Sequence, residues 1–366
     1  MINGFLGLLN VVFAVALLLS AFTSYINPNS IWQLSFAGLL FPPLLVLNLL
    51  FVLFWLLRRH VNAVISVISM MLCSVHISAV FALNLKKNDE TYRLCVMSWN
   101  VKNFDLYNWT GNKATRQKML KIIKEFKPDI LCLQEFYTDE GVIMDNISYL
   151  KDSLGYAYYH FDPSVSLHRT HCNKPIYQRW GVATFSKFPI TGQKRVDFAN
   201  SLSNDCIYTD IVVEKDTLRI FNMHLQSLHL DEKDYQTLQK MEKSGIPDWI
   251  PMKRILRKMK FSYQKRSYQA EQVAKFIRKY NGMQLVCGDL NDIPVSYTYR
   301  TIIRSKNLKD AFAQCGFGFG GTYVINPFSP FRIDYILGSE QINFLRCNKI
   351  NTKLSDHFPV YAEFTW

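Results

Sequence analysis

The sequence predicts an α/β protein that follows a group of apolar membrane helices, and two observations predict it. Residues 1–85 contain no Asp, Glu or Lys, and only Arg58 and Arg59 carry charge there. After residue 85, short apolar runs rich in β-branched residues alternate with stretches of helical spacing, a pattern typical of packed layers of sheet and helix. The predicted organisation is a membrane anchor over residues 1–85, a linker over 86–90 and one large α/β domain over 91–366.

The anchor contains three apolar stretches, roughly Phe5–Phe22, Leu34–Leu57 and Val61–Leu85. Each is close to the ~20 residues that a helix needs to cross a bilayer, so we predict three transmembrane helices. A cleaved signal peptide is the alternative for the first stretch, which lacks a basic start and a convincing small-residue cleavage site. Buried core helices are the alternative for all three.

The charged turn Arg58-Arg59-His60 indicates the orientation of the anchor. Basic loops tend to stay in the cytoplasm, so an odd number of spans would place the large domain outside it. Lys86 and Lys87 argue for the opposite orientation. We expect a multi-pass protein of the bacterial inner membrane with an extracytoplasmic domain.

The large domain is expected to begin with a strand and to alternate from there. The helix over 113–126 follows from apolar residues at helical spacing, and Lys127-Pro128 ends it. Asn281-Gly282 breaks a second long helix before the next strand. The predicted strands are 94–99, 130–133, 181–185, 207–213, 218–223, 283–287 and 331–333, and the predicted helices are 113–126 and 251–280.

The eight cysteines are scattered without paired spacing, which argues against a zinc site or a dense disulfide framework. Four of them could still pair in an oxidising compartment, and the sequence leaves this open. They are Cys172, Cys206, Cys315 and Cys347.

Polar side chains suited to a metal or a phosphate stand at the ends of the apolar runs. We expect them to converge at one active-site opening, which we call the mouth. Hard oxygen ligands and two imidazoles gathered there would suit divalent-metal phosphoryl chemistry. These residues are Asn100, Glu135, His224, Asp289, Asn291, Asp334, Asp356 and His357.

The motifs around these residues occur in a characteristic order. They are Ser98-Trp99-Asn100-Val101, Leu133-Gln134-Glu135, Asn222-Met223-His224-Leu225, Gly288-Asp289-Leu290-Asn291, Arg332-Ile333-Asp334-Tyr335 and Ser355-Asp356-His357. Over residues 91–366 the ordered set resembles the endonuclease/exonuclease/phosphatase superfamily, which has the DNase-I-like fold. The resemblance implies a four-layer sandwich of two mixed β-sheets flanked by helices, and Mg²⁺- or Mn²⁺-dependent hydrolysis of phosphoester bonds.

Three residues are expected to hold the metal. Glu135 is the best ligand because a carboxylate is a hard oxygen donor. Asn100 adds a neutral amide oxygen, which keeps the charge of the site low enough to admit a phosphate. Asp356 would be a second ligand of the metal or of a metal-bound water.

The remaining residues are expected to handle protons and phosphate. Asp289 would orient or deprotonate the attacking water and Asn291 would hold a phosphate oxygen, because residues two apart on an extended segment point the same way; a turn is the alternative. His224 would contact phosphate or the leaving group, with a structural histidine as the alternative. Asp334 resembles the family's partner aspartate for His357, and a carboxylate on Nδ1 would fix its tautomer and raise its basicity.

The charge of the chain indicates which classes of substrate it could bind. The net charge is +13, and all but two of the 42 basic residues follow residue 85, which fits nucleic acid or an anionic membrane surface. The segment 227–265 is longer than the family norm, and ten basic residues lie between Lys253 and Lys279 with Glu271 as the one acidic residue. Such a helix could be solvated, follow a nucleic-acid backbone or lie on anionic lipid.

The predicted function is a membrane-anchored, metal-dependent phosphodiesterase or endonuclease acting on nucleic acid. One alternative is the same chemistry on a phospholipid, either as a sphingomyelin-type phosphodiesterase or as an inositol lipid phosphatase. The other is a binding protein that has lost turnover. No protein partner is inferred.

Overall fold

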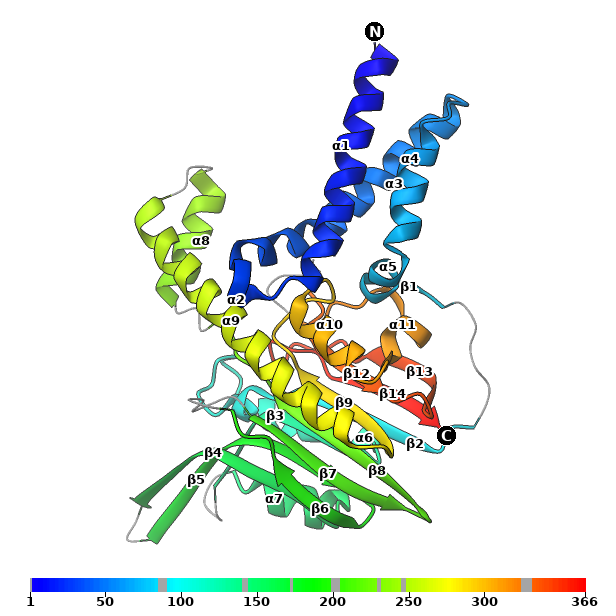
Figure 1. The fold of residues 1–366 in the computed structure, drawn as a ribbon. Coiled ribbons are helices and arrows are strands. Elements are labelled where there is room, and N and C mark those ends of the chain that lie inside the picture. Colours follow the sequence, from blue (N-terminus) through cyan, green and yellow to red (C-terminus); the bar gives the residue numbers. More distant parts are fainter. Residues whose placement is uncertain are drawn as a thin grey trace. The chain divides into compact units, whose positions relative to one another are not determined.

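The computed structural model describes residues 2–84, 91–139, 144–171, 174–198, 205–228, 232–244, 248–323 and 331–366. The chain forms two compact units, shown as a ribbon in Figure 1. The apolar-helix unit comprises residues 1–77, 226–271 and 295–301, and the sandwich unit comprises 78–225, 272–294 and 302–366. The expected linker 86–90 and Cys172 lie outside the described residues, whereas Cys206, Cys315 and Cys347 are free thiols.

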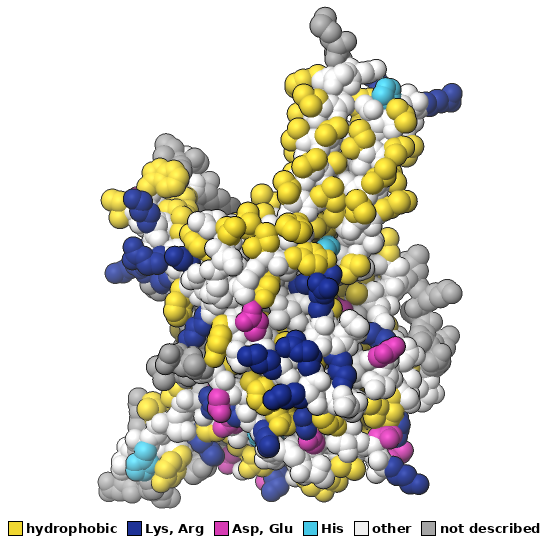
Figure 2. Space-filling view, viewed as in Figure 1, with side chains coloured by type: hydrophobic (Ala, Val, Ile, Leu, Met, Phe, Trp, Pro, Cys, Tyr) yellow, Lys and Arg dark blue, Asp and Glu magenta, His cyan; other side chains and the backbone are white. Residues whose placement is uncertain are grey.

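The apolar-helix unit begins with α1 (Ile2–Phe22), which the 3-10 helices η1 (Thr23–Tyr25) and η2 (Trp32–Leu40) and the short α2 (Pro28–Ile31) connect to α3 (Phe41–Leu57). Helices α4 (Ala63–Leu72) and α5 (Ser74–Val80) follow. Apolar side chains cover the outer surface of these helices (Figure 2). Burying such a surface in lipid removes it from water, as expected of membrane helices.

Two of the three predicted spans are continuous in the described residues. Asn3–Tyr25 and Pro28–Leu57 are long and apolar enough to cross a membrane. The third predicted span is not one straight helix, because the chain bends by 75° between Ala63–Leu72 and Ser74–Val80. It therefore counts as a third span only if the bent pair crosses the membrane together.

A network of neutral polar side chains joins α1, α3 and α4. The Ser66 hydroxyl lies 2.5 Å from Asn10 Oδ1 and 2.9 Å from Asn48 Oδ1. Asn48 Nδ2 donates to the carbonyls of Phe13 and Leu44. Asn10, Asn48 and Ser66 have no exposed surface, so hydrogen bonds replace the water that these groups lose.

The same unit contains α8 (Glu232–Ser244) and most of the long helix α9 (Trp249–Lys279). The predicted helix 251–280 is confirmed within two residues. Arg254 and Lys258 of α9 form ion pairs with the buried Asp234 of α8, at 3.3 and 2.5 Å. These two cations therefore join the helices to each other.

The sandwich unit contains two six-stranded sheets and a small two-stranded one. The first sheet has the order β10-β12-β9-β8-β7-β6 and the second the order β13-β14-β2-β3-β5-β4, while β1 pairs with β11. Only β2–β3 and β8–β9 are parallel among the described strand pairs, so both large sheets are mixed. The strands are β1 (Phe81–Leu83), β2 (Leu94–Asn100), β3 (Ile130–Asp139), β4 (Tyr158–His171), β5 (Lys174–Ser186), β6 (Ile190–Arg195), β7 (Asp205–Val213), β8 (Asp216–His224), β9 (Met283–Asp289), β10 (Lys309–Asp310), β11 (Phe317–Phe319), β12 (Asp334–Gly338), β13 (Asn343–Lys349) and β14 (Val360–Thr365).

One hydrophobic core lies between the two large sheets. It contains Val96 and Ile130 from one sheet and Ile220 and Leu285 from the other. The outer face of the second sheet packs against α6 (Thr115–Phe126) through a separate cluster.

The remaining helices are shorter. They are η3 (Lys102–Asp105), α7 (Asn146–Ser148), η4 (Tyr149–Ser153), α10 (Tyr297–Arg304) and α11 (Ala311–Cys315). The expectation of an α/β fold with two mixed sheets and flanking helices is confirmed.

A buried pair of amides crosses the core. Gln134 of β3 donates to Asn222 Oδ1 of β8 at 2.7 Å, and Asn222 Nδ2 donates to the carbonyl of Ala183 on β5. Gln134 and Asn222 are fully buried, so this hydrogen bond joins the two sheets where water cannot compete for it.

Candidate active site

Strand ends from both sheets bring the predicted polar residues together. Asn100 is the last residue of β2, and His224 and Asp289 are the last residues of β8 and β9. Because β8 and β9 are parallel, their carboxyl ends meet and His224 pairs directly with Asp289. The sequence prediction of one shared mouth is consistent with this arrangement.

Asp334 reaches the mouth in a way that the sequence did not predict. We expected a strand over 331–333 that ends before Asp334, but Asp334 is the first residue of β12. Because β12 runs antiparallel to β9, the start of β12 lies beside the end of β9, and Asp334 pairs with Asp289. Asp334 therefore lies near Asp289, as expected, but it stands at the start of its strand and not after the strand's end.

Gly288 makes the approach of β8 and β9 possible. Its φ of +135° is open to glycine, and a Cβ added there would lie 2.1 Å from the carbonyl oxygen of Met223. Any side chain would push the strands apart just before Asp289 and His224.

Glu135 lies inside a strand, and the prediction that its strand ends at Leu133 is wrong. β3 continues to Asp139, with a shift in its pairing to β5 between Leu133 and Phe136. At this bulge Glu135 has a φ of +46°, which is uncommon for a residue with a side chain. The bulge turns the carboxylate out of the ladder and toward the mouth.

Asn100 connects the carboxylates of the two sheets. Its Nδ2 donates to Glu135 Oε1 at 3.1 Å and to Asp289 Oδ2 at 3.2 Å, while its Oδ1 accepts the backbone N–H of Lys102. A rotation of the amide by 180° would instead present its oxygen to the space between the two carboxylates.

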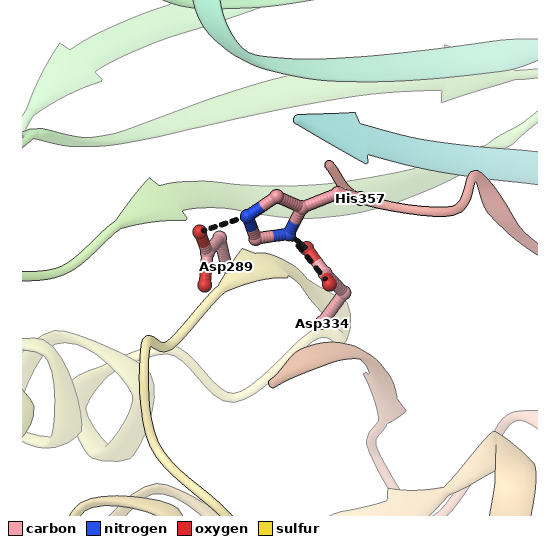
Figure 3. A group of neighbouring side chains, drawn as sticks. All are labelled: Asp289, Asp334 and His357. Carbon is pink, nitrogen blue, oxygen red and sulfur yellow. Dashed lines mark hydrogen bonds and ion pairs between the residues drawn. The ribbon is translucent and has the colours of Figure 1, made fainter. Parts of the chain in front are cut away.

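His357 lies between two aspartates, as Figure 3 shows. Its Nδ1 is 2.9 Å from Asp334 Oδ2, and its Nε2 is 3.6 Å from Asp289 Oδ2. The Trp99 indole donates to the carbonyl oxygen of His357 at 3.0 Å, which fixes the backbone of this segment. The predicted pairing of His357 with Asp334 is present in the structure.

The charge state of His357 follows from these neighbours. Burial acts to lower the pKa of His357, but the negative charges of Asp334 and Asp289 outweigh it and raise the pKa to about 10. At neutral pH the ring is therefore an imidazolium, which donates from both nitrogens.

His224 lies within ion-pair distance of two carboxylates of the site. Its Nε2 is 3.7 Å from Glu135 Oε1 and 3.7 Å from Asp289 Oδ2. Its side chain keeps 11% of its surface exposed, so it can reach a ligand from the open side of the site.

Burial, together with neighbouring negative charges, raises the pKa of both Asp289 and Glu135. Burial is the main cause for each: it raises the pKa of Asp289 to about 6, with a further contribution from Asp334, and it raises the pKa of Glu135, with a contribution from Asp356. A cation placed among these oxygens would relieve both effects.

Asn291 does not lie on an extended segment, so the turn alternative holds, but its side-chain amide still reaches Asp289 Oδ2 at 3.2 Å. It has a φ of +51°. Its N–H donates to Asp289 Oδ1 at 2.8 Å, and its side-chain amide donates to the carbonyl of Leu225 at 3.0 Å. In the structure Asn291 holds the Asp289 carboxylate in place.

Lys102 is a site residue that the sequence reasoning missed. Its Nζ is 2.8 Å from Asp356 Oδ2, so the carboxylate expected to bind metal is already paired with a cation. Burial opposes ionisation of Asp356, but the charges of His357 and Lys102 outweigh it and lower the pKa of Asp356. The one signal for Lys102 in the sequence is its position two residues after Asn100.

The donor set fits a hard divalent cation better at Glu135 than at His357. Asp289, Asp334 and His357 offer ligand atoms within 4.8 Å of one another, but the 2.9 Å contact between Asp334 and His357 is a hydrogen bond that uses Nδ1. Glu135, Asn100 and Asp289 instead offer oxygen atoms of the kind that Mg²⁺ and Mn²⁺ prefer.

Two protein families match parts of this chain. Residues 97–357 match the family described as "Endonuclease/Exonuclease/phosphatase family". The chain belongs to this family. Residues 3–80 match a second model, described as a domain of unknown function.

Solved structures agree with this family at the level of the fold. An endonuclease/exonuclease/phosphatase from Beutenbergia cavernae aligns with a TM-score of 0.52 and 16% identity, over 75% of this chain and 72% of that one. A family protein from Leptotrichia buccalis gives 0.51 and 15% over 75% and 100%, and the human Nocturnin catalytic domain gives 0.51 and 20% over 77% and 95%. No curated protein sequence matches the chain. Members of this family are phosphoric ester hydrolases and generally depend on a metal.

Proposed function

We propose that this chain is a Mg²⁺- or Mn²⁺-dependent phosphodiesterase that hydrolyses nucleic acid and is held at a membrane by residues 1–85. Residues 91–366 would be its catalytic domain, joined through 86–90. The observation that carries the proposal is the chain of contacts from Asp334 through His357 to Asp289, with Glu135 and Asn100 beside it.

Glu135 and Asn100 would hold the metal, with Asp356 as a second carboxylate that contributes to its charge balance. The metal would supply a positive charge that polarises the phosphoryl group. Asp289, fixed by the N–H of Asn291, would orient the attacking water and accept its proton. Its pKa of about 6 leaves it largely ionised at neutral pH and close enough to neutrality to act as a base.

The two histidines would act on the phosphate. His357, protonated and held by Asp334, would donate to a phosphate oxygen and stabilise the charge that develops in the transition state. His224 reaches the open side of the site and would contact the phosphate or the leaving group. Asn291 would act by positioning Asp289 and, as the sequence predicts, by holding a phosphate oxygen.

The apolar-helix unit favours a second candidate, the same hydrolysis on a phospholipid or sphingomyelin-type phosphodiester. A catalytic unit carried by lipid-exposed helices would meet lipid headgroups at high local concentration. The crowded, charged cluster argues against a binding protein without turnover, because burying several carboxylates costs stability and such clusters are typical of active sites.

For the location, we propose a multi-pass protein of the bacterial inner membrane. The basic turn at Arg58 and Arg59 would lie in the cytoplasm. If the bent pair α4 and α5 crosses the membrane, the catalytic domain lies outside the cytoplasm.

The test is hydrolysis by the purified full-length chain with Mg²⁺ or Mn²⁺, offered single- and double-stranded DNA, RNA, sphingomyelin, inositol phospholipids and bis-p-nitrophenyl phosphate. We expect chelator to abolish turnover, added metal to restore it, and Glu135→Gln to remove it while the protein stays folded. Full hydrolysis in excess chelator would refute the metal mechanism. Turnover of lipids with none of nucleic acid would select the second candidate.

A further inference from the structure

We propose that the exposed face of the first half of α9 rests on the anionic headgroups of the membrane that the chain's own helices enter. The proposal rests on the membrane anchorage proposed above and adds a second, electrostatic contact to it. The face comprises Trp249, Ile250, Lys253, Arg257, Lys260 and Phe261, and we call it the α9 stripe.

The α9 stripe combines large apolar residues with cations on one side of the helix. Its members recur at steps of three and four residues, which places them on one face. Ile250 is 84% exposed, Trp249 64% and Phe261 56%. The opposite side is buried and packs inside the unit, for example through Ile255 and Tyr263. Within the part of the chain that the structure describes, the stripe is thus an exposed surface.

Charge in this part of α9 has one sign. Residues 249–270 contain no Asp or Glu. Arg254 and Lys258 are engaged by Asp234 of α8, so they support the helix pair and lie off the stripe. Lys253, Arg257 and Lys260 are exposed, which leaves three cations beside apolar side chains, the composition of an interfacial helix.

Contacts inside the unit place α9 at the end of the apolar helices. The connection between α1 and α3 must lie where two spans leave the lipid. From that connection Asn29 donates to Ser267 of α9 at 3.0 Å, and Asn27 donates to Glu271 at 2.8 Å.

Aromatic contacts continue this attachment toward the α9 stripe. Phe36 packs edge-on against Tyr263 with ring centroids 5.6 Å apart, and Lys260 lies 5.9 Å from the ring centroid of Trp32. Trp and Tyr prefer the boundary between lipid and water. In Figure 1 the N-terminal end of α9 extends to the same side of the unit as α1 and α3.

Anionic lipid fits this surface better than nucleic acid does. A nucleic-acid backbone would use the cations but would leave the aliphatic Ile250 in water, since only aromatic side chains stack on bases. Lipid accommodates both kinds of side chain, with the cations at the phosphates and the apolar residues below them.

The experiment uses the full-length chain with the photocrosslinker p-benzoylphenylalanine at Ile250. The protein is reconstituted in vesicles of phosphatidylcholine, with or without phosphatidylglycerol, and lipid adducts are counted by mass spectrometry. We expect several-fold more adducts in the anionic vesicles. Each cation of the stripe should contribute roughly fivefold to the equilibrium constant for docking, so K253E/R257E/K260E should remove most of the difference.

The matched control is K118E/K121E/K124E, which changes net charge equally on exposed positions of α6 and should leave the adduct yield unchanged. Equal yields in both vesicle types, or a yield that K253E/R257E/K260E does not lower, would overturn the proposal. So would a loss of single-stranded DNA binding in that variant with adducts unchanged, which would make the stripe a nucleic-acid surface.

Two further readouts separate this inference from the proposed function. Flotation with the vesicles after carbonate treatment tests the membrane anchorage itself, and failure to float would overturn both. Hydrolysis of bis-p-nitrophenyl phosphate should be the same in wild type and K253E/R257E/K260E, which also shows that the variant is folded. No hydrolysis by any protein, with the lipid adducts as expected, would refute the phosphodiesterase and leave the lipid contact standing.

Discussion

The molecule contains two buried polar clusters that differ in charge. Among the apolar helices, Asn10, Asn48 and Ser66 are neutral, and their hydrogen bonds satisfy one another and the nearby backbone. In the sandwich unit, the carboxylates of Glu135 and Asp289 lie close together: Asn100 Nδ2 donates to both, and His224 Nε2 is 3.7 Å from each.

The difference teaches how to separate a structural polar cluster from a functional one. A neutral network that satisfies its own hydrogen bonds stabilises the packing around it. Crowded carboxylates with raised pKa values destabilise the fold until a ligand compensates them. Changes in the first cluster should therefore affect stability and spare activity, and changes in the second should do the reverse.

The largest effect is expected for Asp289→Asn. The amide cannot accept a proton from water, so kcat/KM should fall by on the order of 10³- to 10⁴-fold, while the unfolding temperature stays within a few degrees. Steady-state kinetics and thermal unfolding on the same preparation measure both. If Asp289→Asn unfolded the protein as well as inactivating it, the proposed difference between the two clusters would be wrong.

A smaller loss is expected when the Asp334–His357 pair is broken. Asp334→Asn and His357→Ala should each lower kcat by about 100-fold or more, because the carboxylate holds the ring and its charge. If the two act as one unit, the double variant should be scarcely worse than either single one. Multiplicative losses would show that they act independently.

His160 provides a neutral buried imidazole against which charged His357 can be compared. His160 Nδ1 lies 2.8 Å from Thr209 Oγ1, and burial lowers the pKa of His160 to about 4. Below its unfolded pKa of ~6.5 the unfolded chain takes up a proton that the folded chain refuses, so stability falls with falling pH. The loss between pH 7 and pH 5 should be about 2 kcal/mol, and His160→Gln should flatten it in denaturant titrations at the two pH values.

The smallest effect is expected for Asn48→Leu among the apolar helices. Removing the hydrogen bonds to Phe13 and Leu44 should destabilise the helix bundle by about 1 kcal/mol and leave hydrolysis unchanged. Unfolding in detergent and turnover of a soluble substrate provide the two measurements, with Leu49→Ala on the exposed side of α3 as the control. A loss of turnover would show that the neutral cluster is functional after all.

The sequence predicted what local pattern determines. The continuous apolar run 94–99 ending on Asn100 became β2, which is buried at every position, and the helical spacing of apolar residues in 113–126 became the buried face of α6. His224 and Asp289 were each expected at a strand end, and the parallel pairing of β8 and β9 in the structure brings those two ends together.

Features that depend on a partner strand or on a turn could not be predicted in the same way. The bulge at Glu135 exists in the pairing of β3 with β5, and the start of β12 at Asp334 depends on its antiparallel register with β9. Asn291 has a left-handed backbone conformation, so side chains do not alternate from 289 to 291 as they would on the extended segment that we predicted. Lys102 was missed because its pairing with Asp356 spans 254 positions of the chain.

The hydrogen bond between Gln134 and Asn222 has a consequence for how activity is lost on heating. Asn100 and Glu135 come from one sheet, and His224, Asp289 and Asp334 come from the other, so the site exists only while the sheets keep their alignment. The amide pair resists sliding of one sheet across the other. With Asn222→Ala, we expect inactivation to begin at temperatures where circular dichroism still reports intact strands, since the two half-sites would lose their alignment before either sheet unravels.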